Sequence, residues 1–221
     1  MNLFKKPLTP FPSFTDAEKY AANGYCTLPV DRGLAEEGRE TPSSGPWAFG
    51  TTGLAAADGD RYTVGILAGR LSLGGGMGGG RDDCAATRIA VVSVDVHTNK
   101  RVARELEAVI RRWAGEGPVR ESRDSPSLLF PFRVHAEHDP RQFGQTSEFC
   151  KLPGDAPYGP TNKVLVRSAA TCFLAAGGPF TWRDDRDLLA VSRDQLPALT
   201  PADARDIVSE CNRVFYQRSA A

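Results

Sequence analysis

The chain has 221 residues, of which 41% are apolar and 24% charged, so it is long enough for one globular domain with a sizeable core. Its formal net charge is zero, which excludes a strong attraction of the whole molecule to nucleic acid or to a membrane surface. Five scattered cysteines argue against a disulfide framework, and neither a membrane span nor a signal peptide is evident, so we expect a cytoplasmic protein with no membrane partner.

The first elements predicted along the chain are a short helix and two strands. The helix covers residues 15–24 and begins with a capping pair, Thr15 and Glu18. Strands follow at 25–30 and 61–69, where β-branched and aromatic residues gather. The segment between these strands is rich in Gly, Pro, Ser and charge, which is typical of a loop.

Residues 71–83, LSLGGGMGGGRDD, form a Gly-rich loop of low complexity. Gly74, Gly76 and Gly79 satisfy the G-x-G-x-x-G pattern of dinucleotide-binding folds. That pattern requires a helix directly after the glycines, whereas this segment leads into a strand. We therefore interpret it as a flexible loop, with a loop that contacts phosphate as the alternative.

The strongest strand signal lies at residues 88–96, RIAVVSVDV, which are apolar nearly throughout, as in a central strand. A helix is predicted for 99–115, and we expect it to pack on one face of the sheet. Its apolar face consists of Val102, Leu106, Val109, Ile110 and Trp113. Its opposite face carries Arg101, Arg104 and Arg111, which indicate either a solvated surface or a phosphate contact.

A hairpin is predicted next, from strands at 118–122 and 127–134. Pro131 marks the second of these as an edge strand, because proline cannot donate to a sheet. A long polar loop is expected at 135–162, followed by strand material at 163–175.

The last element is a helix at 199–217, which begins with Thr200 as N-cap and Pro201 in its first turn. Its buried face is expected to hold Ile207, Val208, Cys211, Val214 and Phe215. Strands and helices mix along the chain without regular β-α-β alternation. The sequence therefore predicts a single α+β domain over residues 1–221, with a mostly antiparallel or mixed sheet.

The residues best placed for chemistry end the strand at 88–96. Side chains two apart on a strand project from the same face, so Ser93, Asp95 and His97 are expected to project together. A carboxylate at this place is costly to bury unless it is paired or bound to a cation. A metal-dependent site is one interpretation, and an aspartate that caps the following helix beside a half-exposed histidine is the other.

The order of these segments resembles the N-terminal domain of bifunctional DNA primase/polymerases, the prim-pol branch of the archaeo-eukaryotic primase superfamily. The resemblance runs from about Thr15 to Val208 and rests on the order and spacing of the similar segments. The similar segments are, in chain order, AEKYAANGYCTLPV, YTVGILAG, VVSVDVH, PVRESRDSPSLLFPFR, GGPFTW and LPALTPADARDIV.

The resemblance implies a sheet related to RNA-recognition-motif folds and a nucleotidyltransferase that uses Mg²⁺ or Mn²⁺. Asp95 and His97 occupy the catalytic and metal-binding positions of such an enzyme. Arg120, Arg123 and Arg133 stand where nucleic acid or nucleoside triphosphate would bind, and we expect them to flank the same concave surface as Asp95. In such sites, carboxylates hold paired metal ions that stabilise the attacking and leaving oxygens.

The sequence departs from the family pattern at several polar positions. His97 replaces the second acid, Ser127 replaces a lysine and Phe173 replaces a histidine, and no third carboxylate precedes the segment around Phe173. One imidazole could shift the metal preference toward softer ions, but the combined losses predict weak or absent catalysis. Loop carboxylates could restore the acid count, and the candidates are Asp83, Glu148 and Asp155.

Three functions stay open on these grounds. The first is an active or variant primase/polymerase. The second is a catalytically silent relative that binds nucleic acid, nucleotide or protein, for example an inhibitor from a phage or mobile element. The third is an unrelated α+β binding domain. Any replication role is expected to need replication proteins in trans.

Two further patterns carry weaker signals. His135 and His138 have H-x-x-H spacing, and a zinc site that joins them to Asp95 or His97 is a minor alternative, because the helical context of zinc proteases is missing. Residues 99–123 carry seven Lys or Arg against four Glu, which suits modest contact with phosphates.

Overall fold

The computed structural model describes residues 10–12, 16–40, 61–68, 88–135, 137–168 and 171–219. These residues form two sheets with packed helices, and nearly all strand pairs are antiparallel, which confirms the predicted α+β class. The larger sheet has the strand order β6-β7-β3-β5-β4-β9, with β10 paired in parallel to β5. Its strands are β3 (Ile89–Asp95), β4 (Arg120–Ser122), β5 (Leu128–Val134), β6 (Gln145–Thr146), β7 (Lys163–Arg167), β9 (Phe180–Trp182) and β10 (Ala198–Leu199).

The smaller sheet has three antiparallel strands in the order β1-β2-β8. Its strands are β1 (Thr27–Asp31), β2 (Tyr62–Ala68) and β8 (Thr171–Leu174). Two short helices accompany it, α1 (Ala17–Ala22) and α2 (Arg32–Glu36). The side chain of Asp31 caps α2 by accepting from the backbone N–H of Gly33 at 2.9 Å.

Strand β3 is central to the larger sheet, as the sequence predicted. It pairs with β5 on one side and with β7 on the other, and both Val92 and Val94 are fully buried. Alternate β3 side chains enter two different cores. Val92 and Val94 pack toward the long helices, and Ile89 and Val91 pack toward the smaller sheet.

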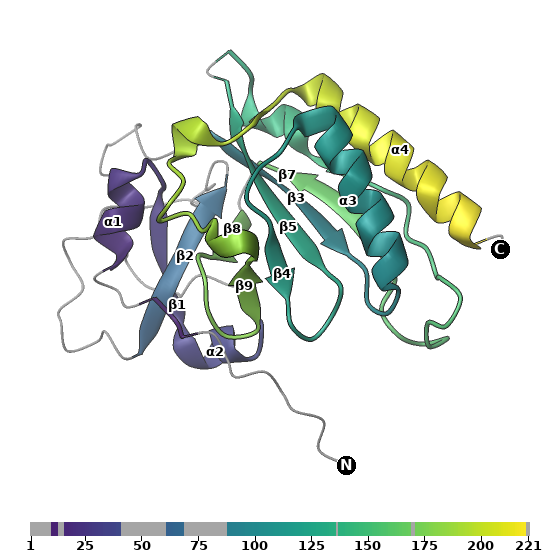
Figure 1. The fold of residues 1–221 in the computed structure, drawn as a ribbon, viewed down its shortest axis with the longest axis horizontal. Helices are drawn as coiled ribbons and strands as arrows, with labels where there is room; N and C mark the ends of the chain where they lie inside the picture. Colours follow the sequence, from purple (N-terminus) through teal and green to yellow (C-terminus); the bar gives the residue numbers. More distant parts are fainter. Residues whose placement is uncertain are drawn as a thin grey trace, which may run out of the picture.

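Two long helices, α3 (Lys100–Ala114) and α4 (Pro201–Ser219), cover one face of the larger sheet (Figure 1). The Asn99 side chain caps α3 by accepting from the backbone N–H of Val102 at 3.1 Å. The predicted apolar face of α3 is buried except at Trp113, which is 43% exposed while Ala114 reaches the core instead. No described helix is long and apolar enough to cross a membrane.

The predicted apolar face of α4 is buried throughout: Ile207, Val208, Cys211, Val214 and Phe215. At its start, the hydroxyl of Thr200 accepts from the backbone N–H of Asp203 at 3.1 Å, and the carboxylate of Asp203 accepts from the backbone N–H of Thr200 at 3.0 Å. This reciprocal capping fixes where α4 begins.

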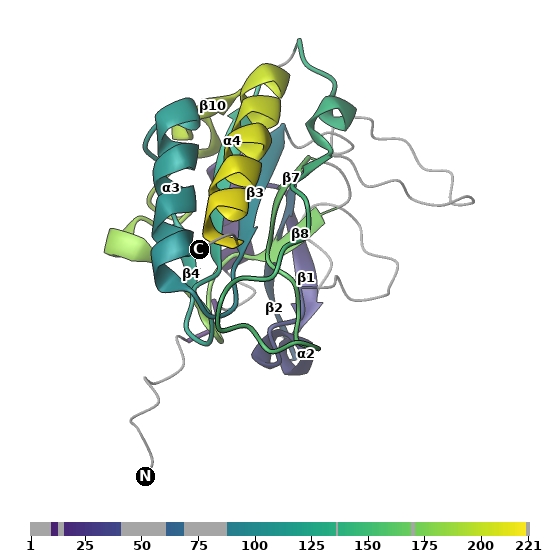
Figure 2. The same cartoon turned by 90° about the vertical axis from the view of Figure 1, so that its right-hand side faces the viewer.

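The smaller sheet covers the other face of the larger one, so the molecule has three layers (Figure 2). Ile66 of β2 and Phe173 of β8 join Ile89 and Val91 of β3 in one fully buried cluster. This cover extends along β3 only as far as Val91. The next two residues with the same orientation, Ser93 and Asp95, are partly exposed and line a cavity.

The prediction that Pro131 lies on an edge strand is wrong, because β5 has partners on both sides. Pro131 is tolerated by its position within the strand. Arg133 donates its backbone N–H to Pro197 on the β10 side, so the nitrogen of Pro131, two residues earlier, points to the same side. That side is paired at Leu128–Leu129 by β4 and at Arg133–Val134 by β10, and Pro131 falls between the two.

Two other segments are more structured than predicted. The expected long loop at 135–162 contains η4 (Pro140–Phe143) and β6, and it buries Phe143 and Leu152 in the core under α3 and α4. The strand material at 163–175 forms two strands in different sheets, β7 and β8. The isolated apolar residues of the loop have no periodic spacing, so their burial could not be predicted from local sequence.

Some expectations fall outside the described residues. They concern the Gly-rich loop at 71–83, the capping residue Thr15 and the candidate ligand Asp83. Within the described part of the chain, Cys150, Cys172 and Cys211 are free thiols.

Candidate functional site

A cavity of about 390 Å³ opens beside the end of β3, where the smaller sheet no longer covers the larger one. Ser93 and Asp95 line it from β3, and the turn between β4 and β5 forms a wall. Residues that follow α2 reach it from the smaller layer, among them Glu40. The cavity therefore lies where β3, the β4–β5 turn and the α2 segment meet.

Asp95 is half-buried in this cavity. Burial raises the pKa of its carboxyl group, although Lys163, whose Nζ lies 3.8 Å from a carboxylate oxygen, opposes that rise. A raised pKa means that the surroundings compensate the negative charge only in part. Asp95 is thus the kind of group that gains from a cationic or hydrogen-bonding ligand.

His97 does not share the cavity with Ser93 and Asp95. Strand β3 ends at Asp95, and Val96 turns into the core beneath the helices. The backbone N–H of His97 donates to Oδ1 of Asn162 at 3.1 Å, and its ring Nε2 lies 3.3 Å from the carbonyl oxygen of Thr161. Val96 still faces the same core as Val92 and Val94, but the chain has left the strand before His97, so the expected common orientation holds for Ser93 and Asp95 only.

Arg120 is the most buried charged residue of the cavity, with 4% exposure. Its Nη1 donates to the carboxylate of Glu40 and, at 2.9 Å, to the carbonyl oxygen of Leu174. Its guanidinium carbon lies 4.1 Å from the ring centroid of Phe180 and 5.6 Å from that of Phe173. The Nε of Arg120 has no hydrogen-bond partner among the described residues.

Glu40 is a site residue that the sequence did not reveal. One of its carboxylate oxygens accepts both from Arg120 and from the backbone N–H of Leu174, the latter at 2.9 Å. It lies 80 residues before Arg120, in a segment without a strand or helix pattern. No local signal could have paired the two, because their contact depends on how the two sheets stack.

The three predicted arginines lie in three different places. Arg120 lines the cavity of Asp95, and Arg123 lines a neighbouring groove. Arg133 pairs with Ile89 at the opposite end of β3, where its Nε donates to the carbonyl oxygen of Leu196 at 3.0 Å. The structure therefore brings only Arg120 together with Asp95, and the expectation of one shared surface is wrong for Arg133.

The residues near Asp95 do not fit a paired-metal site. No group of three or more His, Cys, Asp or Glu side chains within the described part of the chain could hold a metal ion. One oxygen of Glu40 already serves Arg120 and Leu174. Asp155 is likewise engaged, by the side chains of Thr98 and Asn162, each at 2.5 Å. Paired-metal chemistry needs several converging oxygens, and Asp95 brings one carboxylate.

The proposed histidine site is not assembled either. His135 lines a small cavity together with Arg133, far along the sheet from Asp95. His138 packs edge-on against Phe143, with ring centroids 6.4 Å apart.

The cavity is acidic although the whole chain is neutral. Among the described residues that line it, one cation, Arg120, stands against five carboxylates: Glu36, Glu37, Glu40, Asp95 and Asp124. A free triphosphate would be repelled by this lining unless a cation entered with it, whereas a positively charged group would be attracted.

A groove of about 1030 Å³ adjoins the cavity and shares the β4–β5 turn with it. The N-terminal half of α3 forms its other wall through Lys100 and Arg104. The turn is fixed to the end of β3, because the hydroxyl of Ser127 donates to the carbonyl oxygen of Val96 at 3.2 Å. His97 also lines this groove, so the two predicted catalytic residues face two connected depressions.

Comparisons with family models, curated proteins and solved structures give no match for this chain. The chemistry of the cavity and the groove is therefore the basis on which a function can be inferred.

Proposed function

We propose that this chain is a prim-pol-like domain that acts in the cytoplasm, binds nucleic acid or nucleotide and transfers nucleotides weakly or not at all. The observation that carries the proposal is at the end of β3. Asp95 faces the cavity, while His97, at the position of the family's second acid, lines the groove instead. The order of sequence segments along the chain supports the relation to primase/polymerases.

The weakness of catalysis follows from the donor groups that are present. In-line phosphoryl transfer depends on cations that neutralise charge on the transferred group. Here the positions of the family's lysine and histidine are Ser127 and the buried Phe173, so two positive or hydrogen-bonding groups are lost. Arg120 keeps a guanidinium in the cavity, but Glu40 already neutralises it.

The test is nucleotide incorporation by the purified protein, measured by primer extension and by dinucleotide synthesis with Mg²⁺ and with Mn²⁺. We expect the rate with Mg²⁺ to equal that of the Asp95→Ala variant, and the rate with Mn²⁺ to be low. Robust synthesis with Mg²⁺ that disappears in Asp95→Ala would contradict the proposal and indicate an active primase/polymerase.

A second candidate function is protein binding, for example as an inhibitor that a phage or mobile element encodes. The acidic lining of the cavity favours it, because a lysine or arginine side chain of a partner would find carboxylates on several sides. Calorimetry with an arginine-rich peptide tests this candidate. Binding that is lost in a Glu37→Gln/Asp124→Asn variant would support it, and no measurable binding would exclude it.

A further inference from the structure

The groove beside the cavity contains charges of both signs. Its described lining includes four cations, Lys100, Arg104, Arg123 and Arg183, and three carboxylates, Glu107, Glu121 and Asp124. The net sign of the groove depends on which of these charges are paired.

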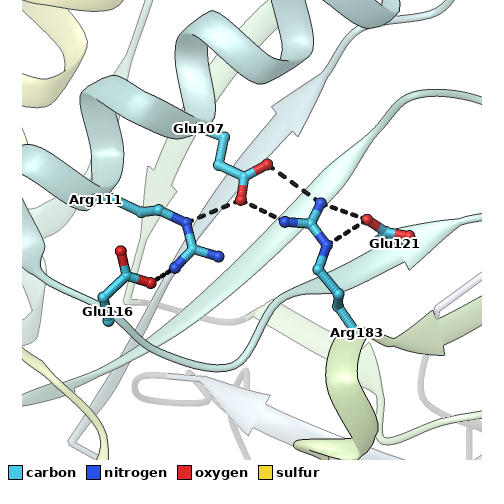
Figure 3. A network of polar contacts seen from close by, with 5 residues as sticks. All are labelled: Glu107, Arg111, Glu116, Glu121 and Arg183. Carbon is cyan, nitrogen blue, oxygen red and sulfur yellow. Dashed lines mark hydrogen bonds and ion pairs between the residues drawn. The ribbon is translucent and has the colours of Figure 1, made fainter.

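Figure 3 shows that the carboxylates of Glu107 and Glu121 are turned toward arginines. Arg183 lies between them and forms ion pairs with both. Glu107 also accepts from the Nε of Arg111 at 2.9 Å, and Arg111 forms a second pair with Glu116. These two groove carboxylates are thus paired with guanidinium groups held in fixed positions.

Asp124, the third carboxylate, lies 3.2 Å from the Nε of its neighbour Arg123. Lys100 and Arg104 differ from the other cations of the groove, because neither has a carboxylate within ion-pair distance in the part of the chain that the structure describes. They are four residues apart, so they project from the same side of α3, one turn from each other. The groove therefore presents two adjacent positive charges that no described carboxylate pairs with.

We propose that this groove binds the phosphate backbone of single-stranded nucleic acid through Lys100 and Arg104. The proposal rests on the proposed function and assigns the nucleic acid to the groove rather than to the acidic cavity. Two cations one turn apart suit a ligand with a repeated negative charge, and guanidinium groups match phosphate oxygens in geometry. The described lining of the groove contains no Phe, Tyr or Trp side chain, and the imidazole of His97 is its one described aromatic ring, so it offers little surface for stacking bases.

The small stacking surface determines the kind of binding. Contacts to phosphates alone carry no sequence information and weaken as salt displaces the protein. The groove should therefore bind mixed-sequence strands with similar affinity and with a strong dependence on salt. Acidic polypeptide is the competing ligand class, since it also presents repeated negative charge.

The experiment measures fluorescence anisotropy of a labelled, mixed-sequence single-stranded DNA against the full chain over a series of salt concentrations. The test variant is Lys100→Ala/Arg104→Ala. The control is Arg101→Ala/Arg112→Ala, which removes the same charge from the same helix at residues outside the groove, next to Glu105 (3.2 Å) and Glu210 (3.8 Å). A charge-preserving variant, Lys100→Arg/Arg104→Lys, shows whether loss of binding reflects loss of charge.

We expect the test variant to bind roughly tenfold more weakly, and the slope of log affinity against log salt to fall by about 1.4, as for the loss of two phosphate contacts on a single strand. The control and the charge-preserving variant should bind like the original chain. If the test and control variants weakened DNA binding equally, the groove would not be the binding site and the attraction would come from the general surface charge.

Two other results would also overturn the inference, and they separate it from the proposed function. DNA binding that the test variant leaves intact would place the contact elsewhere and leave the proposed function standing. Absence of DNA binding even at low salt would contradict this inference and also the nucleic-acid binding in the proposed function. Tighter binding of polyglutamate than of DNA, lost in the test variant, would replace nucleic acid by an acidic protein.

Discussion

At the scale of single residues, the cavity is organised around a buried arginine that interacts with both layers of the molecule. Arg120 belongs to β4 in the larger sheet, and its partners Glu40 and Leu174 belong to the smaller layer. The rings of Phe173 and Phe180 lie against its guanidinium. A charge at this depth is tolerated because it is paired and hydrogen-bonded, and removing either partner leaves the other poorly compensated.

Replacement of Arg120 should therefore destabilise the fold and not only the site. We expect Arg120→Ala to lower the free energy of unfolding by roughly 3 kcal/mol. Urea unfolding followed by circular dichroism measures this. Arg123→Ala, which removes an arginine paired with its exposed neighbour Asp124, should cost about 0.5 kcal/mol or less. Equal effects of the two variants would mean that Glu40 and the aromatic rings do not hold Arg120.

Asp95 makes a prediction about pH. Because burial raises its pKa in the folded chain, folding favours the protonated form, and stability decreases as pH rises from the unfolded pKa through the folded one. We expect Asp95→Asn to stabilise the protein at pH 7, and the difference from the original chain to vanish in acid below the unfolded pKa of about 3.9. Urea unfolding of both proteins at pH 7 and in acid measures this difference in stability. If Asp95→Asn were less stable than the original chain at pH 7, the attraction between Asp95 and Lys163 would outweigh the cost of burying the carboxylate.

At the scale of elements, the side chain of Arg183 connects the middle of α3 to β4. Arg183 lies in η5 (Arg183–Asp185), directly after β9, and its guanidinium bridges Glu107 of α3 and Glu121 of β4 (Figure 3). This bridge joins the helix layer to the β4–β9 end of the larger sheet. It also pairs with the two carboxylates beside Lys100 and Arg104, so one structural feature affects both the position and the charge of the groove.

The bridge predicts an acid-sensitive contribution to stability from Glu107. Burial disfavours its charge, but hydrogen bonds from Arg183 and Arg111 outweigh burial and lower the pKa of Glu107. Its contribution is therefore present above the unfolded pKa of about 4.3 and is lost as pH falls through the lower folded pKa. We expect Glu107→Gln to cost roughly 1–3 kcal/mol at pH 7, and the cost to shrink in acid.

Chemical unfolding at pH 7 and in acid checks this prediction. Glu116→Gln serves as control, because Glu116 belongs to the same network but is largely exposed. A cost for Glu107→Gln that stays constant over this pH range would mean that shape, and not charge, holds α3 to this end of the sheet.

At the scale of the whole molecule, a formal charge of zero conceals two opposite local charges. Carboxylates outnumber cations five to one among the described residues that line the cavity between the layers. In the adjoining groove, Lys100 and Arg104 have no ion-pair partner among the described residues. The two share the turn between β4 and β5, so a ligand that spans both would meet positive charge on one side and negative charge on the other. Net charge alone could not reveal this separation, since the charged residues come from distant parts of the chain.

The sequence by itself determined the elements whose signals are local. The apolar run of β3, the apolar face of α4 and its cap at Thr200 all depend on residues a few positions apart, and each was predicted. The α+β class followed from the order of such elements. These features are present in the folded chain as predicted because hydrophobic periodicity and backbone capping act within one element.

Only the tertiary structure decided which side chains meet at the site. The contact of Glu40 with Arg120, the separation of His97 from Asp95 and the division of 163–175 between two sheets all depend on strand pairing and layer stacking. Pro131 shows the same limit, because its place between β4 and β10 is set by strands from elsewhere in the chain. Local sequence fixes which face a strand residue can present, whereas non-local pairing decides what lies opposite that face and where the alternation stops.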